Sequence, residues 1–151
     1  MPETWFYILG PATSTDQVFI SLAEKAWKKY SSLCIWADHR QSAQQLDELL
    51  WSWNPELFIP HSLLDQDYPP KNPPALLGWP GLMPPDCAVF INMSQHHCPE
   101  SLRCTRLIEL VPDEPVARTR KRQAWTLYRQ RGWPVVSHEL HNNPSPPPAG
   151  V

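Results

Sequence analysis

WFYILGPATSTDQVFISLAEKAWKKYSSLCIWA, residues 5–37, decides the fold class of this chain. The stretch begins and ends with short apolar runs, Trp5–Leu9 and Leu33–Ala37, that do not alternate with polar residues. Such runs are typical of strands buried on both faces of a sheet. Between them, apolar residues recur at helical spacing over Asp16–Tyr30. We therefore predict a β-α-β unit with parallel strands.

The rest of the chain repeats this alternation. A second helix is expected to begin at Asp38, and further strands are predicted at Leu57–Ile59, Cys87–Met93, Leu107–Val111 and Pro134–Leu140. The pattern predicts one α/β domain over residues 1–140, with a mainly parallel central sheet and helices on both faces.

Two segments interrupt the regularity. Residues 65–85 are rich in proline, and we expect an irregular surface insertion there; one short strand at Leu76 and Leu77 is an open alternative. Residues 141–151, HNNPSPPPAGV, have the composition of a disordered tail.

A basic helix is predicted over Val116–Trp133. Asp113, Glu114 and Pro115 suit its start, and Gly132 suits its end. Helical spacing puts one cationic and aromatic face on this helix, comprising Arg118, Arg122, Trp125 and Arg129. The opposite, core-facing side is expected to carry Val116, Ala117, Ala124, Leu127 and Tyr128.

Positive charge is concentrated around this helix. Residues 103–131 contain eight basic and three acidic residues, whereas the whole chain has 13 basic and 15 acidic residues and a net charge of −2. A solvated helix surface is the plain interpretation. However, an exposed tryptophan among arginines is also a composition found at interfaces, and it suits an acidic peptide, a terminal carboxylate or a nucleic-acid backbone.

No catalytic or cofactor-binding pattern stands out. The first strand-to-helix turn, residues 10–15, matches neither nucleotide-binding fingerprint. Asp38 and His39 are interpreted as a helix N-cap and a first-turn residue rather than an acid–base pair. The four cysteines lack zinc spacing, and no apolar run could span a membrane. We expect a soluble, cytoplasmic binding protein that is not an enzyme and holds no cofactor or metal.

Several short blocks together resemble the chi subunit of bacterial DNA polymerase III. They occur in family order and cover nearly the whole chain apart from the proline-rich segments. The blocks are FYIL at 6–9, LDELLW at 46–51, LFIPHSL at 57–63, ELVPDE at 109–114 and LYRQRGWPV at 127–135.

The resemblance implies a Rossmann-like fold and a non-catalytic accessory subunit of the polymerase. Such a subunit would link the clamp-loader complex, through the psi subunit, to the acidic C-terminal tail of single-stranded DNA-binding protein. The tail-binding positions would be Arg118, Arg122 and Trp125, where tyrosine is familiar at the last one.

Two further positions follow from the same resemblance. Thr126 stands where the family has a lysine, and Lys121 or Arg129 could compensate. The psi-binding surface would include Trp51 and Phe58, where a helicase is another possible partner. The alternative function is direct binding of single-stranded nucleic acid by the basic helix, which the net charge of −2 disfavours.

Overall fold

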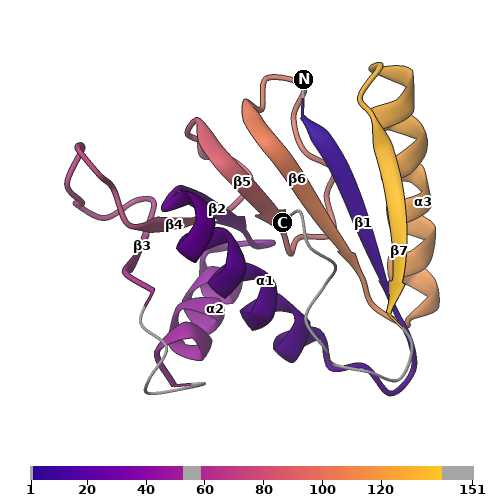
Figure 1. Ribbon diagram of the computed structural model, residues 1–151, viewed down its shortest axis with the longest axis horizontal. Coiled ribbons are helices and arrows are strands. Elements are labelled where there is room, and N and C mark those ends of the chain that lie inside the picture. The colour runs from indigo at the N-terminus through magenta and orange to yellow at the C-terminus, as the bar shows by residue number, and fades with distance from the viewer. Residues whose placement is uncertain (1, 53–58, 141–151) are drawn as a thin grey trace.

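A computed structural model describes residues 2–52 and 59–140 (Figure 1). In chain order its elements are β1 (Glu3–Leu9), α1 (Thr15–Tyr30), β2 (Leu33–Trp36), α2 (Arg40–Ser52), β3 (His61–Leu63), β4 (Ala75–Gly78), β5 (Cys87–Asn92), β6 (Cys104–Val111), α3 (Pro115–Gln130) and β7 (Val135–Leu140). No helix among the described residues is long and apolar enough to cross a lipid bilayer.

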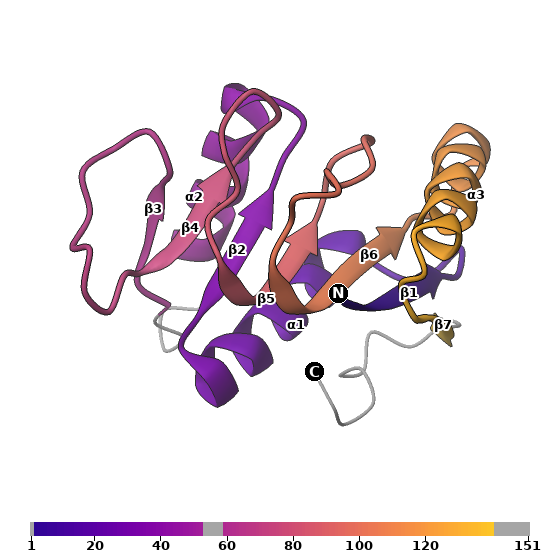
Figure 2. The same ribbon diagram turned by 90° about the horizontal axis from the view of Figure 1, so that it is seen from above.

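The strands form one sheet in the order β3-β4-β2-β5-β6-β1-β7, and every pairing in it is parallel. Helices α1 and α2 cover one face, while α3 lies on the opposite face beside β7 (Figures 1 and 2). The predicted α/β, Rossmann-like domain with helices on both faces is therefore confirmed. Helix α3 connects β6 to β7 across β1, and β7 is the last strand of the sheet on this side.

Alternating side chains of the strands fill two separate cores. In β1, Tyr7 and Leu9 pack in the cluster that includes Phe19 and Leu22 of α1. Phe6 of the same strand points to the other face, in the cluster that includes Tyr128 of α3. This alternation explains why the run at 5–9 is apolar throughout, because both of its faces are covered.

The third strand differs from the prediction at the residues that can be compared. Leu57 and Phe58 lie outside the described residues, and Ile59 belongs to no strand. The described strand, β3, begins at His61, immediately after Pro60. Proline has no backbone N–H to donate to a ladder, although its carbonyl accepts from the N–H of Ala75 at 2.8 Å.

The proline-rich segment contains the short strand left open by the sequence. This strand, β4, lies inside the sheet between β3 and β2, and all four of its residues are buried. The expectation of a purely surface segment is therefore wrong at residues 75–78. Gly78 is needed there, because a Cβ at this position would lie 2.4 Å from the ring of Trp36.

The start of α2 also differs from the prediction. Asp38 does not cap the helix; its carboxylate instead accepts the N–H of Gln95 at 2.7 Å. The first turn is closed by His39 and Ser42. The N–H of Ser42 donates to Nδ1 of His39, and the N–H of His39 donates to Oγ of Ser42. The pair forms a reciprocal cap similar to a capping box.

Candidate functional site

Helix α3 begins close to where its sequence predicts, but it ends at Gln130, three residues before the predicted end at Trp133. The carboxylate of Glu114 accepts the N–H groups of Val116 at 2.9 Å and Ala117 at 2.7 Å. These two hydrogen bonds lower the pKa of Glu114, because they favour its charged form. At the other end Gly132 has a φ of 81°, a conformation that suits glycine. The helix is thus anchored at both ends.

A hollow of about 290 Å³ lies between α3 and the end of the sheet. All three predicted tail-binding residues line it, so the structure brings them together. Strands β1, β6 and β7 supply its other walls. The lining residues are Phe6, Ile8, Val111, Arg118, Lys121, Arg122, Trp125 and Glu139.

Arg118 is the more constrained of the two arginines. Its Nη2 donates to the carbonyl oxygen of Leu9 at 3.0 Å and to the carboxylate of Asp113 at 2.9 Å. The side chain is only 31% exposed. Arg118 therefore ties α3 to the end of β1, and part of its charge is already neutralised within the protein.

Arg122 and Trp125 differ from each other in exposure. Arg122 is exposed, and within residues 2–52 and 59–140 no hydrogen bond or ion pair joins its guanidinium to the protein. The indole of Trp125 is half-buried rather than exposed, because it packs against the ring of Phe6 with 5.1 Å between centroids. The hollow therefore offers an available cation beside a fixed aromatic wall.

Two other residues modify the charge around the hollow. Glu139 of β7 places a carboxylate in its lining. Thr126, where the resemblance implies a lysine, is exposed, and its hydroxyl donates to the carbonyl of Arg122 at 3.2 Å. The site is consequently less cationic than the count of arginines in α3 suggests.

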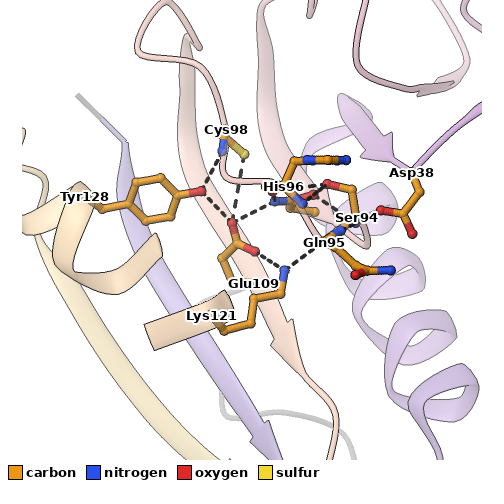
Figure 3. Close-up of polar contacts among 9 residues, drawn as sticks. Asp38, Ser94, Gln95, His96, Cys98, Glu109, Lys121 and Tyr128 are labelled. Carbon is orange, nitrogen blue, oxygen red and sulfur yellow. Dashed lines mark hydrogen bonds and ion pairs between the residues drawn. The ribbon is translucent and has the colours of Figure 1, made fainter. Parts of the chain in front are cut away.

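The predicted core side of α3 is partly wrong. Val116 is 57% exposed, whereas Ala124 and Tyr128 are buried as expected. Lys121 is also buried, at 6% exposure, although the sequence placed it among the available cations. Its Nζ lies 2.6 Å from the carboxylate of Glu109 on β6 and 2.9 Å from the carbonyl oxygen of Ser94 (Figure 3).

Glu109 is the centre of a buried polar network. Besides Lys121, its carboxylate accepts from the hydroxyl of Tyr128 at 2.8 Å (Figure 3). It also accepts from the amide of Asn92 at 2.9 Å. The oxygen of Tyr128 in turn accepts the N–H of Cys98 at 2.7 Å. Burial and the charge of Glu109 both raise the pKa of Tyr128, so its hydroxyl stays protonated.

The sequence did carry a signal for this network. Glu109 interrupts the apolar strand run at 107–111, where a charge needs a partner. Lys121 and Tyr128 are seven residues apart and therefore share a helix face. The sequence also groups Lys121 with the basic residues of 103–131, and this grouping hides the network.

The predicted psi-binding surface is described only in part. Trp51, near the end of α2, is 59% exposed, and its ring lies 4.7 Å from that of His61. Nε2 of His61 lies 3.1 Å from the carboxylate of Asp47. Phe58 lies outside the described residues, so its proximity to Trp51 stays a prediction.

Comparisons with known proteins point to one family. Residues 1–136 match the family described as DNA polymerase III chi subunit, HolC. A Pseudomonas aeruginosa protein named DNA polymerase III subunit chi is 34% identical over 143 residues, which cover 93% of this chain and 98% of that protein. Proteins with the same name from Haemophilus influenzae and Escherichia coli are 28% and 24% identical over 139 and 140 residues. These matches cover 89% and 88% of this chain, and 95% of each relative.

Proposed function

We propose that this chain, which belongs to the DNA polymerase III chi subunit family, binds the acidic C-terminal tail of single-stranded DNA-binding protein in the hollow beside α3. As a member of that family it is an accessory subunit in DNA replication. In the proposal it is non-catalytic, acts in the cytoplasm, and connects the tail to the clamp loader through psi.

The observation that carries the proposal is the pairing of Arg122 with Trp125. A guanidinium with no partner among the described residues can form charge-assisted hydrogen bonds with a carboxylate. The indole, held in place by Phe6, offers an apolar wall for the last side chain of the tail. An acidic segment that ends in an apolar residue matches both features.

Direct binding of single-stranded nucleic acid is the competing function. Binding of a phosphate backbone favours a broad positive field. Around this hollow the field is interrupted by Asp113, which pairs with Arg118, and by Glu139. The local charge therefore favours a short ligand with few negative groups over an extended polyanion.

Titration of a labelled tail peptide against the whole chain tests the proposal. We expect the wild type to bind, Arg122→Ala and Trp125→Ala to bind about tenfold more weakly, and all affinities to fall with added salt. Arg120→Ala is the matched control, because it removes an equal charge from an exposed position of α3 outside the lining of the hollow. Equal binding by all four proteins would place the tail elsewhere.

The same proteins titrated with a single-stranded oligonucleotide test the competing function. If the oligonucleotide binds more tightly than the peptide, and if Arg120→Ala weakens it as much as Arg122→Ala does, the nucleic-acid function replaces the peptide function. We expect the peptide to bind more tightly, because only it offers an apolar terminal residue to Trp125.

The proposed psi-binding surface has its own test. Trp51 exposes a large indole, which a partner can cover favourably. Trp51→Ala and Phe58→Ala should weaken the psi complex more than they lower the melting temperature of the free chain. A residue whose replacement lowers both equally belongs to the core rather than to an interface, and that result would remove it from the proposed surface.

A further inference from the structure

The inner side of α3 combines aromatic packing with buried polar contacts. Its buried residues are Lys121, Ala124 and Tyr128. The rings of Tyr128 and of the half-buried Trp125 pack on Phe6, with 6.1 Å and 5.1 Å between centroids. Apolar contact is not directional, so it does less than hydrogen bonding to fix the rotation of a helix about its axis. The polar groups of Lys121 and Tyr128 are both bonded to Glu109.

These two bonds hold α3 at points two turns apart. Seven residues separate Lys121 from Tyr128, which corresponds to about 10.5 Å along a helix axis. Hydrogen bonds weaken steeply when their distance or angle changes. Two such bonds to a single carboxylate therefore oppose both rotation of α3 and its sliding along the sheet.

Arg122 and Trp125 depend on that rotation. Arg122 follows Lys121 directly, and Trp125 lies on the helix surface one turn from both tied residues. At a radius of ~5–6 Å, a rotation of ~20° displaces a side chain by ~2 Å. Such a displacement exceeds the tolerance of a charge-assisted hydrogen bond.

We propose that Glu109 is the positioning residue of the α3 site: through Lys121 and Tyr128 it sets the rotation of α3 that presents Arg122 and Trp125 to the hollow. Glu109 itself is fully buried and does not line the hollow. The inference rests on the proposed function for its binding consequence, but the orientation of Trp125 can be measured without any ligand.

Two variants weaken the ties and leave Arg122 and Trp125 in place. The first leaves every residue that lines the hollow unchanged, whereas the second also replaces Lys121 in that lining. Tyr128→Phe removes one hydroxyl that donates to Glu109. The double variant Glu109→Gln/Lys121→Met removes the ion pair and keeps a stem of similar length at 121. Replacing both members of a buried ion pair is often neutral for stability. The double variant should therefore keep the melting temperature within a few degrees of the wild type.

The readouts are the dissociation constant of the labelled tail peptide and the NMR signal of the Trp125 indole N–H, assigned with Trp125→Phe. We expect about threefold weaker binding for Tyr128→Phe, at least tenfold weaker binding for the double variant, and a shifted Trp125 signal in both. Leu22→Ala is the control, because Leu22 is fully buried in the other core. It should lower the melting temperature while binding stays within twofold of the wild type.

Each outcome decides one of the two proposals. A folded double variant that binds within twofold of the wild type and keeps its Trp125 signal overturns the positioning role. If the double variant does not fold, Tyr128→Phe decides by the same two criteria. If the wild type does not bind the peptide, the proposed function fails, and the Trp125 signal alone then supports or overturns the role of Glu109.

Discussion

Lys121 and Arg122 are neighbours in the sequence and carry the same charge, yet they occupy opposite environments. Lys121 is 6% exposed and is bonded to Glu109, whereas Arg122 is exposed beside the hollow. The difference follows from helix geometry, since consecutive residues point about 100° apart. One cation therefore holds the helix in place, and the other is available to a ligand.

The comparison shows why a count of charges is a poor guide to a binding site. Eight basic residues lie between 103 and 131, but the structure uses several of them internally. Besides Lys121, Arg118 pairs with Asp113, and Arg131 donates to the carbonyl oxygen of Cys98 at 2.8 Å. A hydrogen-bond acceptor within reach, rather than the charge itself, separates a structural cation from an available one.

The largest expected effect is on the free energy of unfolding, through the buried ion pair of Lys121 with Glu109. Glu109→Ala leaves the ammonium of Lys121 buried without its carboxylate, and breaking a buried pair in this way costs about 3–5 kcal/mol. Chemical denaturation monitored by circular dichroism measures the change in unfolding free energy. Arg122→Ala serves as the comparison and should change it by less than about 0.5 kcal/mol. Similar losses in both variants would mean that the two cations do not have separate roles.

The next effect concerns ligand binding by Arg122. A hydrogen bond to a charged group contributes about 1.5–3 kcal/mol, and exposure to solvent and salt reduces it toward the lower value. We therefore expect Arg122→Ala to weaken peptide binding about tenfold, since 1.4 kcal/mol corresponds to a factor of ten. Arg122→Lys should recover only part of the loss, because an ammonium lacks the planar fork. Full recovery in a calorimetric titration would show that charge alone matters.

Arg118 is intermediate between the buried Lys121 and the available Arg122. Its guanidinium is shared with Leu9 and Asp113, so less of it is available to a ligand. We expect Arg118→Ala to weaken peptide binding about threefold and to destabilise the chain by about 0.5–1 kcal/mol. Asp113→Ala would free Arg118 and should tighten binding. If Arg118→Ala matches Arg122→Ala in both measurements, the internal contacts of Arg118 do not limit it.

The sequence predicted the fold better than the chemistry of single side chains. Apolar runs and helical periodicity found β1, β2 and α3, because burial on one or both faces leaves a direct pattern. The same patterns placed Arg118, Arg122 and Trp125 on one helix face, and all three line the hollow. Patterns could not show that Trp125 packs on Phe6, since that contact joins residues far apart in the chain.

The smallest effect concerns Glu114, an exposed carboxylate that contrasts with the buried Glu109. Its pKa lies below the ordinary value of 4.5, because Val116 and Ala117 donate their N–H groups to it. A lowered folded-state pKa gives stability that is present above the unfolded value and is lost as the pH falls through the folded value. The free energy of unfolding of Glu114→Ala should therefore differ from wild type most above pH 4.5, and the difference should shrink as the solution is acidified below that pH. Glu100→Ala, which removes an exposed carboxylate outside the helices, is the control and should show no such trend. A difference that stays constant across this range would mean that the cap acts without its charge.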